Sequence, residues 1–241
     1  MWQANGIHRL GEGLVNAYLL EDGGEVTIID AGAPAYWGAL PAELAAMGRT
    51  LDDVRAVVLT HAHTDHIGFA ERIRRERGVP VRVHEDDATL ARGERKQTGQ
   101  ATGSIRVVPL LRFLWFAVRH GMLRIPPVRE VVTFGDGATL DVPGAPCVIA
   151  LPGHSPGSAA LHVPGRDALF IGDAIATTAV TTGATGPQLA PFSSDRAQAL
   201  DSLARLEGIE AGLVLPGHGA PWTGGVAEAV RVVRAGAVRG G

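Results

Sequence analysis

Cysteine is nearly absent from this sequence of 241 residues, which contains only Cys147. One thiol cannot form an internal disulfide, so a disulfide framework is excluded. Basic charge is also sparse: the formal net charge is −3, and no dense run of Lys or Arg occurs. Because binding to nucleic-acid phosphates needs concentrated basic charge, we expect no nucleic-acid partner.

Long apolar runs are missing as well. The most apolar stretch, residues 107–118, contains Pro109 and Arg112 and is too short to cross a bilayer, so no stable membrane insertion is expected. The first ten residues show no basic segment followed by an apolar stretch and no small-residue cleavage site, which predicts a cytoplasmic protein. With 46% hydrophobic residues and no low-complexity linker, residues 1–241 are expected to form a single domain.

The most informative segment present is His61-Ala-His63-Thr-Asp65-His66, which directly follows the apolar run 54–59. Imidazole and carboxylate together suit Zn²⁺, Fe²⁺ or Mn²⁺ better than Ca²⁺ or Mg²⁺. His61 and His63 are two residues apart and can converge on one ion, whereas the adjacent Asp65 and His66 are free to serve a second. A polar loop with locally hydrogen-bonded histidines is the alternative, and four potential ligands in six positions disfavour it.

Three further candidate ligands, His154, Asp173 and His218, each follow a short apolar run and lie in a turn that contains Gly or Pro. A single Gly-Asp or Gly-His turn would be weak support for a metal site. Recurrence at four strand ends favours a shared centre. The remaining histidines are interpreted as surface or satisfied core residues: His8, His84, His120 and His162.

In this order, the string 61–66, His154, Asp173 and His218 resemble the metallo-β-lactamase-fold superfamily of hydrolases. Nearly the whole chain shares the resemblance, from the segments 16–18 and 28–32 onward. It implies an α/β fold, the four-layer αβ/βα sandwich, with the site along one edge of the paired sheets. One departure is Phe69, where many relatives have a second glycine at the helix start; it affects packing beside the site.

The resemblance also implies the roles of the seven residues. One metal would be held by His61, His63 and His154, and the other by Asp65, His66 and His218. Asp173 would bridge both, and Asp65 would also orient the nucleophile, so these two aspartates are the expected catalytic residues. Two Zn²⁺ are expected, with Fe or Mn possible. Asp30 either supports the histidine loop from behind, as in the family, or is a turn or helix N-cap residue.

Hydrophobic periodicity predicts ten strands and four helices in two similar halves. The predicted strands lie near 14–20, 25–30, 54–59, 80–84, 130–133, 138–142, 146–151, 158–163, 167–172 and 211–216. The predicted helices lie near 35–47, 66–77, 194–207 and 226–238.

The chain between His66 and His154 is longer than two strands and a helix need, and the surplus forms an inserted segment at about 93–127. Its first part is a polar loop, and apolar residues at 110, 111, 114, 115 and 118 then match one face of a helix. The helix either packs on the core or forms a lid that gives the metal site an apolar substrate pocket.

The expected reaction is hydrolysis of a carbonyl substrate, a lactone, ester or thioester, by a hydroxide shared between the metals. The partner is then a small molecule, and a hydrophobic one if the inserted segment is a lid; the oligomeric state stays open. Alternatives are a β-lactam-hydrolysing enzyme, a mononuclear iron persulfide dioxygenase and a non-catalytic metal-binding protein. Asp173 disfavours the first, because the family's β-lactamases generally have Cys or Ser there.

Other branches of the family match less well. Glyoxalase II-type thioesterases have a C-terminal helical region, whereas only 23 residues follow His218. Acyl-homoserine lactonases share all seven ligands but place a tyrosine shortly after the bridging Asp, and residues 174–177 contain none. Oxygen-reducing di-iron relatives typically carry Glu where His63 stands. A lactonase-like or ester-hydrolysing enzyme is therefore favoured.

Overall fold

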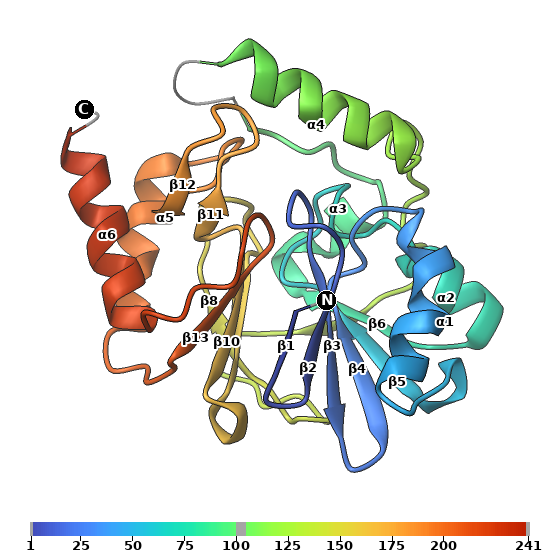
Figure 1. The fold of residues 1–241 in the computed structure, drawn as a ribbon. Coiled ribbons are helices and arrows are strands. Elements are labelled where there is room, and N and C mark those ends of the chain that lie inside the picture. The colour runs from blue at the N-terminus through green and yellow to red at the C-terminus, as the bar shows by residue number, and fades with distance from the viewer. Residues whose placement is uncertain (1, 100–104, 240–241) are drawn as a thin grey trace.

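The computed structural model describes residues 2–99 and 105–239, which fold around two facing β-sheets (Figure 1). The first sheet runs in sequence order: β1 (Gln3–Ala4), β2 (Ile7–Leu10), β3 (Ala17–Asp22), β4 (Glu25–Ile29), β5 (Val54–Val58), β6 (Val81–His84) and β7 (Val132–Phe134). The second has the order β13 (Leu213–Pro216), β10 (Ala168–Gly172), β9 (Ala159–Val163) and β8 (Cys147–Ala150). A small hairpin pairs β11 (Ala176–Thr178) with β12 (Thr185–Gln188).

Successive side chains of each strand point to opposite faces of its sheet, and the buried ones therefore form three hydrophobic layers. In β3, Leu19 packs towards the outer helices, while Leu20 packs between the sheets. In β10, Phe170 faces the inter-sheet core and Leu169 the opposite helical layer. Strands buried on both faces have to be apolar at nearly every position, as these are.

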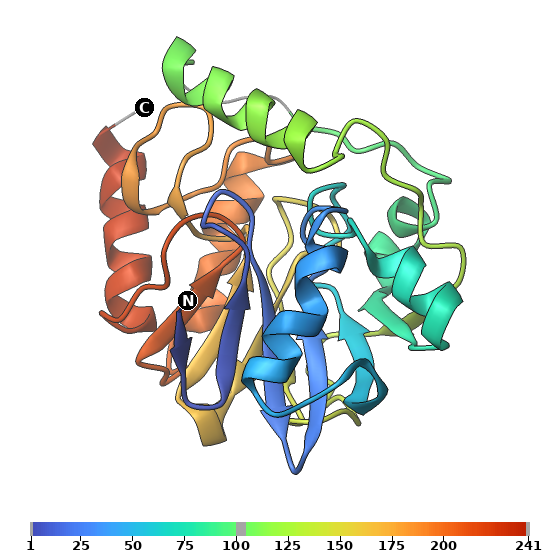
Figure 2. The ribbon, with the colours of Figure 1, turned by 45° about the vertical axis from the view of Figure 1, so that its right-hand side comes forward.

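Helices cover the outer faces of both sheets (Figure 2). The first sheet carries α1 (Tyr36–Ala46) and α2 (Ala70–Arg77), and the short α3 (Ala88–Ala91) follows β6. The second carries α5 (Arg196–Ser202), a 3₁₀ turn over Leu203–Leu206 and α6 (Val226–Arg239). The predicted αβ/βα sandwich is therefore confirmed.

The parallel pairing of several strands determines at which edge of the sheets the candidate site forms. The strands β4, β5 and β6 run parallel in the first sheet, and β10 runs parallel to β13 in the second. The carboxyl ends of these strands consequently open onto one edge of the sandwich, and the loops that carry the predicted ligands meet there.

Three predicted elements differ clearly from those observed. The helix predicted at 194–207 is α-helical only over Arg196–Ser202 and continues as a 3₁₀ turn over Leu203–Leu206. The strand predicted at 138–142 is only a single bridge, Thr139 to Cys147, because Pro143 and Pro146 interrupt the return of the chain. The helix predicted at 66–77 begins at Ala70, since backbone bonds from Ala31 and Gly68 hold residues 66–68 against the turn after β4.

The inserted segment forms a helix, α4 (Val107–Arg119), of which Phe116 and Ala117 are buried. The helix is as predicted, but the alternative in which residues 110, 111, 114, 115 and 118 pack on the core is wrong for most of these side chains. Leu111, Leu114, Trp115 and Val118 are exposed, and Leu110 is half-buried. Burial depends on the orientation of the helix, which periodicity alone does not define. Part of the predicted polar loop, 100–104, lies outside the described residues.

Among residues 2–99 and 105–239, no helix combines the length and apolar character needed to cross a membrane.

Candidate metal centre

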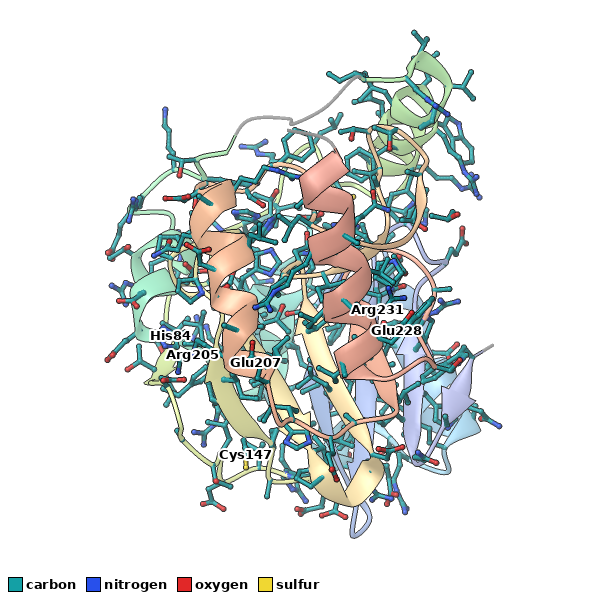
Figure 3. All side chains as sticks on the ribbon, turned by 90° about the vertical axis from the view of Figure 1, so that its left-hand side faces the viewer. His84, Cys147, Arg205, Glu207, Glu228 and Arg231 are labelled. Atoms are coloured by element: carbon teal, nitrogen blue, oxygen red, sulfur yellow. The ribbon has the colours of Figure 1, made fainter. Side chains whose placement is uncertain are left out.

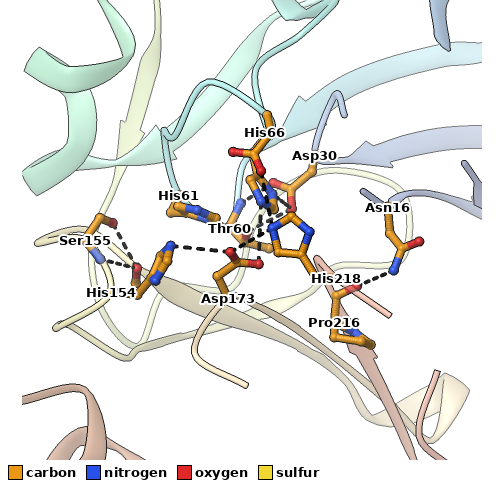
Figure 4. Close-up of polar contacts among 12 residues, drawn as sticks. Asn16, Asp30, Thr60, His61, His66, His154, Ser155, Asp173, Pro216 and His218 are labelled. Atoms are coloured by element: carbon orange, nitrogen blue, oxygen red, sulfur yellow. Dashed lines mark hydrogen bonds and ion pairs between the residues drawn. The ribbon is translucent and has the colours of Figure 1, made fainter. Parts of the chain in front are cut away.

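All seven predicted ligands lie together at the carboxyl edge of the sheets. Figure 4 labels five of them: His61, His66, His154, Asp173 and His218. His61, His63, Asp65 and His66 come from the loop after β5, and the others follow β8, β10 and β13. Six of the seven are buried, with side chains at most 6% exposed: His61, His63, His66, His154, Asp173 and His218. Asp65 is half-buried.

The first group consists of His61, His63 and His154, whose candidate ligand atoms all lie within 4.8 Å of one another. The ring centroids are 4.7 Å apart for His61 and His63 and 4.5 Å apart for His63 and His154. Three imidazoles from two loops therefore converge at spacings that suit one metal ion.

The second group consists of Asp65, His66 and His218, and it meets the same 4.8 Å criterion. Asp65 Oδ2 lies 3.3 Å from His218 Nε2. Asp173 lies between the two groups: its Oδ2 is 3.4 Å from His154 Nε2 and 3.1 Å from His218 Nε2. One carboxylate thus contacts histidines of both groups.

Neighbouring groups hold the other ring nitrogens of these histidines. Nδ1 of His66 lies 2.9 Å from Asp30 Oδ2, and Nδ1 of His154 lies 3.2 Å from Ser193 Oγ. Nδ1 of His218 bonds the carbonyl of Leu14. Such partners fix the ring orientation and the tautomer of metal-binding histidines.

Several buried polar atoms inside the cluster lack a hydrogen-bond partner: Nε2 of His61, His66 and His154, and Oδ1 of Asp173. Buried polar atoms are almost always paired, because an unpaired one costs about 1–3 kcal/mol. Imidazole nitrogens and carboxylate oxygens gathered without other partners are the donor set that a divalent transition metal requires, since the metal displaces the proton from any protonated ring. The cluster is able to bind metal.

The charge pattern differs between the two groups. Burial lowers the pKa of His63 to about 3 and that of His154 to about 4, so both rings are neutral near pH 7. Burial also lowers the pKa of His66, but the carboxylates of Asp30, Asp173 and Asp65 outweigh it and raise the value to about 9. The second group therefore sits in a strongly negative environment that favours a cation.

Asp87 is a residue that the sequence analysis missed. Its fully buried carboxylate accepts hydrogen bonds from Ala62 N, Ser155 Oγ and Gly157 N, at 2.9, 2.7 and 2.8 Å. It thereby ties the loop of His61 and His63 to the loop of His154. The sequence offered only a weak signal, an acidic run directly after the strand at 80–84.

Asn16 and Tyr18 hold the loop of His218. Asn16 Nδ2 donates to the carbonyls of Pro216 and Gly219 at 2.9 and 2.8 Å, and the Tyr18 hydroxyl donates to Pro216 O at 2.8 Å. A strand of the first sheet is thus connected to a ligand loop of the second, across the facing edges.

Gly217 stands where no side chain fits. A Cβ there would lie 2.3 Å from Asp173 Oδ1 and 2.5 Å from His66 Cε1, closer than real contacts. The backbone itself therefore forms a wall of the cluster, and only glycine allows that approach.

A cavity of about 260 Å³ opens beside the cluster. Polar residues of the centre form its floor, among them His63, Asp65, His154, Asp173 and His218. Apolar residues form much of the remaining wall: Phe113, Ala117, Met122, Val180, Pro191 and Phe192. Phe113 and Ala117 belong to α4, so this helix covers the candidate site with one face.

Together, the four-layer fold and its histidine–aspartate cluster define a metal-binding protein of the αβ/βα sandwich class. A sequence model of the metallo-beta-lactamase superfamily matches residues 10–218. The chain belongs to this superfamily, whose members include metallo-hydrolases.

Three relatives illustrate the similarity. The probable metallo-hydrolase YflN of Bacillus subtilis (strain 168) is 30% identical over 234 residues, which cover 92% of this chain and 86% of YflN. The metallo-beta-lactamase family protein TTHA1429 of Thermus thermophilus superposes with a TM-score of 0.70 at 26% identity, covering 97% of this chain and 80% of that one. TTHA1623, solved in a di-iron-bound form, has a TM-score of 0.62 at 27% identity and covers 94% and 97%.

Proposed function

We propose that this protein is a dinuclear metal-dependent hydrolase that attacks the carbonyl of a small lactone, ester or thioester, with zinc as its metal. One observation carries the proposal: Nε2 of three buried histidines and Oδ1 of Asp173 have no hydrogen-bond partner within one cluster, and Asp173 contacts histidines of both ligand groups. TTHA1623 was solved in a di-iron-bound form, which supports two metal ions per chain in this protein as well. The metal analysis described below identifies the element.

In this proposal, His61, His63 and His154 would hold one ion, Asp65, His66 and His218 would hold the other, and Asp173 would serve both. When bound, the two ions supply an activated water near neutral pH and polarise the scissile carbonyl. The chain itself contributes ligand orientation, through Asp30 at His66 and Ser193 at His154. Asp65, half-buried at the cavity floor, is the carboxylate that orients the attacking water.

The cavity contributes substrate binding. Phe113, Met122 and Phe192 form apolar walls that suit an acyl chain, and they exclude water from the reacting carbonyl. We propose that α4 is the lid of a single domain and that its inner face contacts the substrate. The expected cytoplasmic location is part of the same proposal.

Metal analysis combined with a substrate panel tests the proposal. Protein purified without added metal should contain two Zn per chain and should hydrolyse lactones, esters or thioesters. One Fe per chain with persulfide oxidation would favour a dioxygenase instead, and preferential turnover of β-lactams would favour a β-lactamase. Full occupancy with no turnover of any panel member would indicate a non-catalytic metal-binding protein.

A further inference from the structure

The outward face of α4 is an apolar surface that no other described element covers. We define it by Val107, Val108, Leu111, Leu114, Trp115 and Val118, which are 49–77% exposed. Ile105 and Leu123, at 53% and 79%, extend it at both ends. Among residues 2–99 and 105–237, whose side-chain burial the structure describes, Val132 is the one remaining large hydrophobic side chain that is comparably exposed. Exposed apolar side chains gathered on one helix mark a binding surface.

The segment that contains this surface is basic in sequence. Between Glu94 and Glu130 the sequence contains seven basic residues and no acidic one, although the whole chain has a net charge of −3. The basic residues are Arg95, Lys96, Arg106, Arg112, Arg119, Arg124 and Arg129. The segment is therefore cationic in an otherwise acidic protein.

Two of the arginines border the outward face directly. Arg112 and Arg119 are seven residues apart, which places them on the same side of a helix, and both are exposed. The guanidinium of Arg119 lies 5.5 Å from the centre of the Trp115 ring. A tryptophan and several aliphatic side chains thus lie beside a row of positive charge, the arrangement of helices that lie in a lipid–water interface.

The helix is also placed for contact with a broad surface. In Figures 1 and 2, α4 runs along the top of the molecule as its outermost element. Its 13 residues extend about 20 Å at 1.5 Å per residue, too short to cross a bilayer but sufficient to lie along one. The opposite face, with Phe113 and Ala117, lines the cavity of the metal cluster.

We propose that the outward face of α4 docks onto the surface of anionic phospholipid membranes, with the apolar side chains among the acyl chains and the arginines at the phosphates. Charge complementarity favours this occupant. A second copy of the chain, paired through the same face, would bring two cationic segments together. Anionic headgroups instead attract each exposed arginine.

Co-sedimentation with vesicles tests the proposal. Full-length protein should bind vesicles of phosphatidylcholine mixed with phosphatidylglycerol far more tightly than phosphatidylcholine alone, and added salt should weaken that binding. Arg112→Gln with Arg119→Gln should weaken binding about 25-fold, since each charge removed costs about fivefold. Leu111→Ser with Val118→Ser should weaken it roughly tenfold or more.

Matched controls come from other surfaces. Arg231→Gln with Arg234→Gln removes two charges from the outer helix α6 (Figure 3), and Val132→Ser removes an exposed apolar side chain outside α4. Both should bind as the parent does. The Trp115 fluorescence should shift to shorter wavelength with anionic vesicles, and Trp115→Phe should lose that shift.

Three results would overturn the proposal: no binding to anionic vesicles, equal binding by the α4 variants and the parent, or no Trp115 shift. If the parent is instead a dimer by sedimentation velocity, and the Leu111/Val118 variant is a monomer, the face is a contact between copies. None of these measurements depends on hydrolytic activity.

Discussion

Oδ2 of Asp30 lies 2.9 Å from Nδ1 of His66 and orients that ring so that its Nε2 faces Asp173 at 3.5 Å. Asp30 also accepts hydrogen bonds from the backbone N and the hydroxyl of Thr60, both at 2.8 Å. The N-cap residue of α1 is Ala35, so the alternative that Asp30 caps this helix is wrong. Its carboxylate instead holds the start of the histidine loop and one of its rings.

Asp30→Asn tests this relationship without changing side-chain size. Asp30 has a φ of 59°, and asparagine adopts this left-handed conformation readily, so the fold should persist. The amide cannot accept as strongly from His66, and metal affinity at the second site should fall about 10- to 100-fold. Competition against a chromophoric chelator measures the affinity, with Asp52→Asn on the surface as the control. Unchanged affinity at both sites would contradict the role given to Asp30.

Asp173→Ala removes the carboxylate that contacts both ligand groups. The variant should lose one of the two metals and most turnover, because Asp173 Oδ2 lies 3.4 Å from His154 Nε2 and 3.1 Å from His218 Nε2, one histidine from each ligand group. Elemental analysis after dialysis and initial rates on the best substrate give the two readouts. Full metal content with full activity would rule out a bridging role.

Gly217→Ala perturbs the centre without altering any ligand. The new Cβ would approach Asp173 Oδ1 to 2.3 Å, so the carboxylate has to move. We expect metal affinity to fall about tenfold or more. Gly38→Ala in α1 is the control, since its Cβ meets nothing within 4 Å. Circular dichroism should show both variants folded, and equal metal affinity of the two would contradict the predicted clash.

Phe113→Ala and Trp115→Ala separate the two faces of α4. Phe113 lines the cavity, whereas Trp115 is 63% exposed on the outward face. Phe113→Ala should raise KM for long-chain acyl substrates about tenfold and leave short ones nearly unchanged. Trp115→Ala should leave both unchanged with soluble substrates. Equal effects of Phe113→Ala on short and long chains would contradict a substrate-binding lid.

The sequence by itself determined which side chains meet at the centre. Strand ends in this fold converge on one edge, so residues that follow apolar runs, such as His61, Asp173 and His218, were identifiable from the local pattern. Most strands were predicted for the same reason, because burial on both faces makes them apolar throughout.

Tertiary structure alone decided the contacts between distant segments. Asp87 accepts a hydrogen bond from Ser155, which is 68 residues away in the sequence, and so joins two ligand loops. Ser193 lies against His154 although 39 residues separate them. No local sequence pattern encodes such pairs. The sequence also could not predict how α4 is rotated about its own axis, because apolar residues occur on several sides of this helix. Packing against the cavity decides that rotation. That rotation leaves one apolar face for the candidate substrate site and turns another outward.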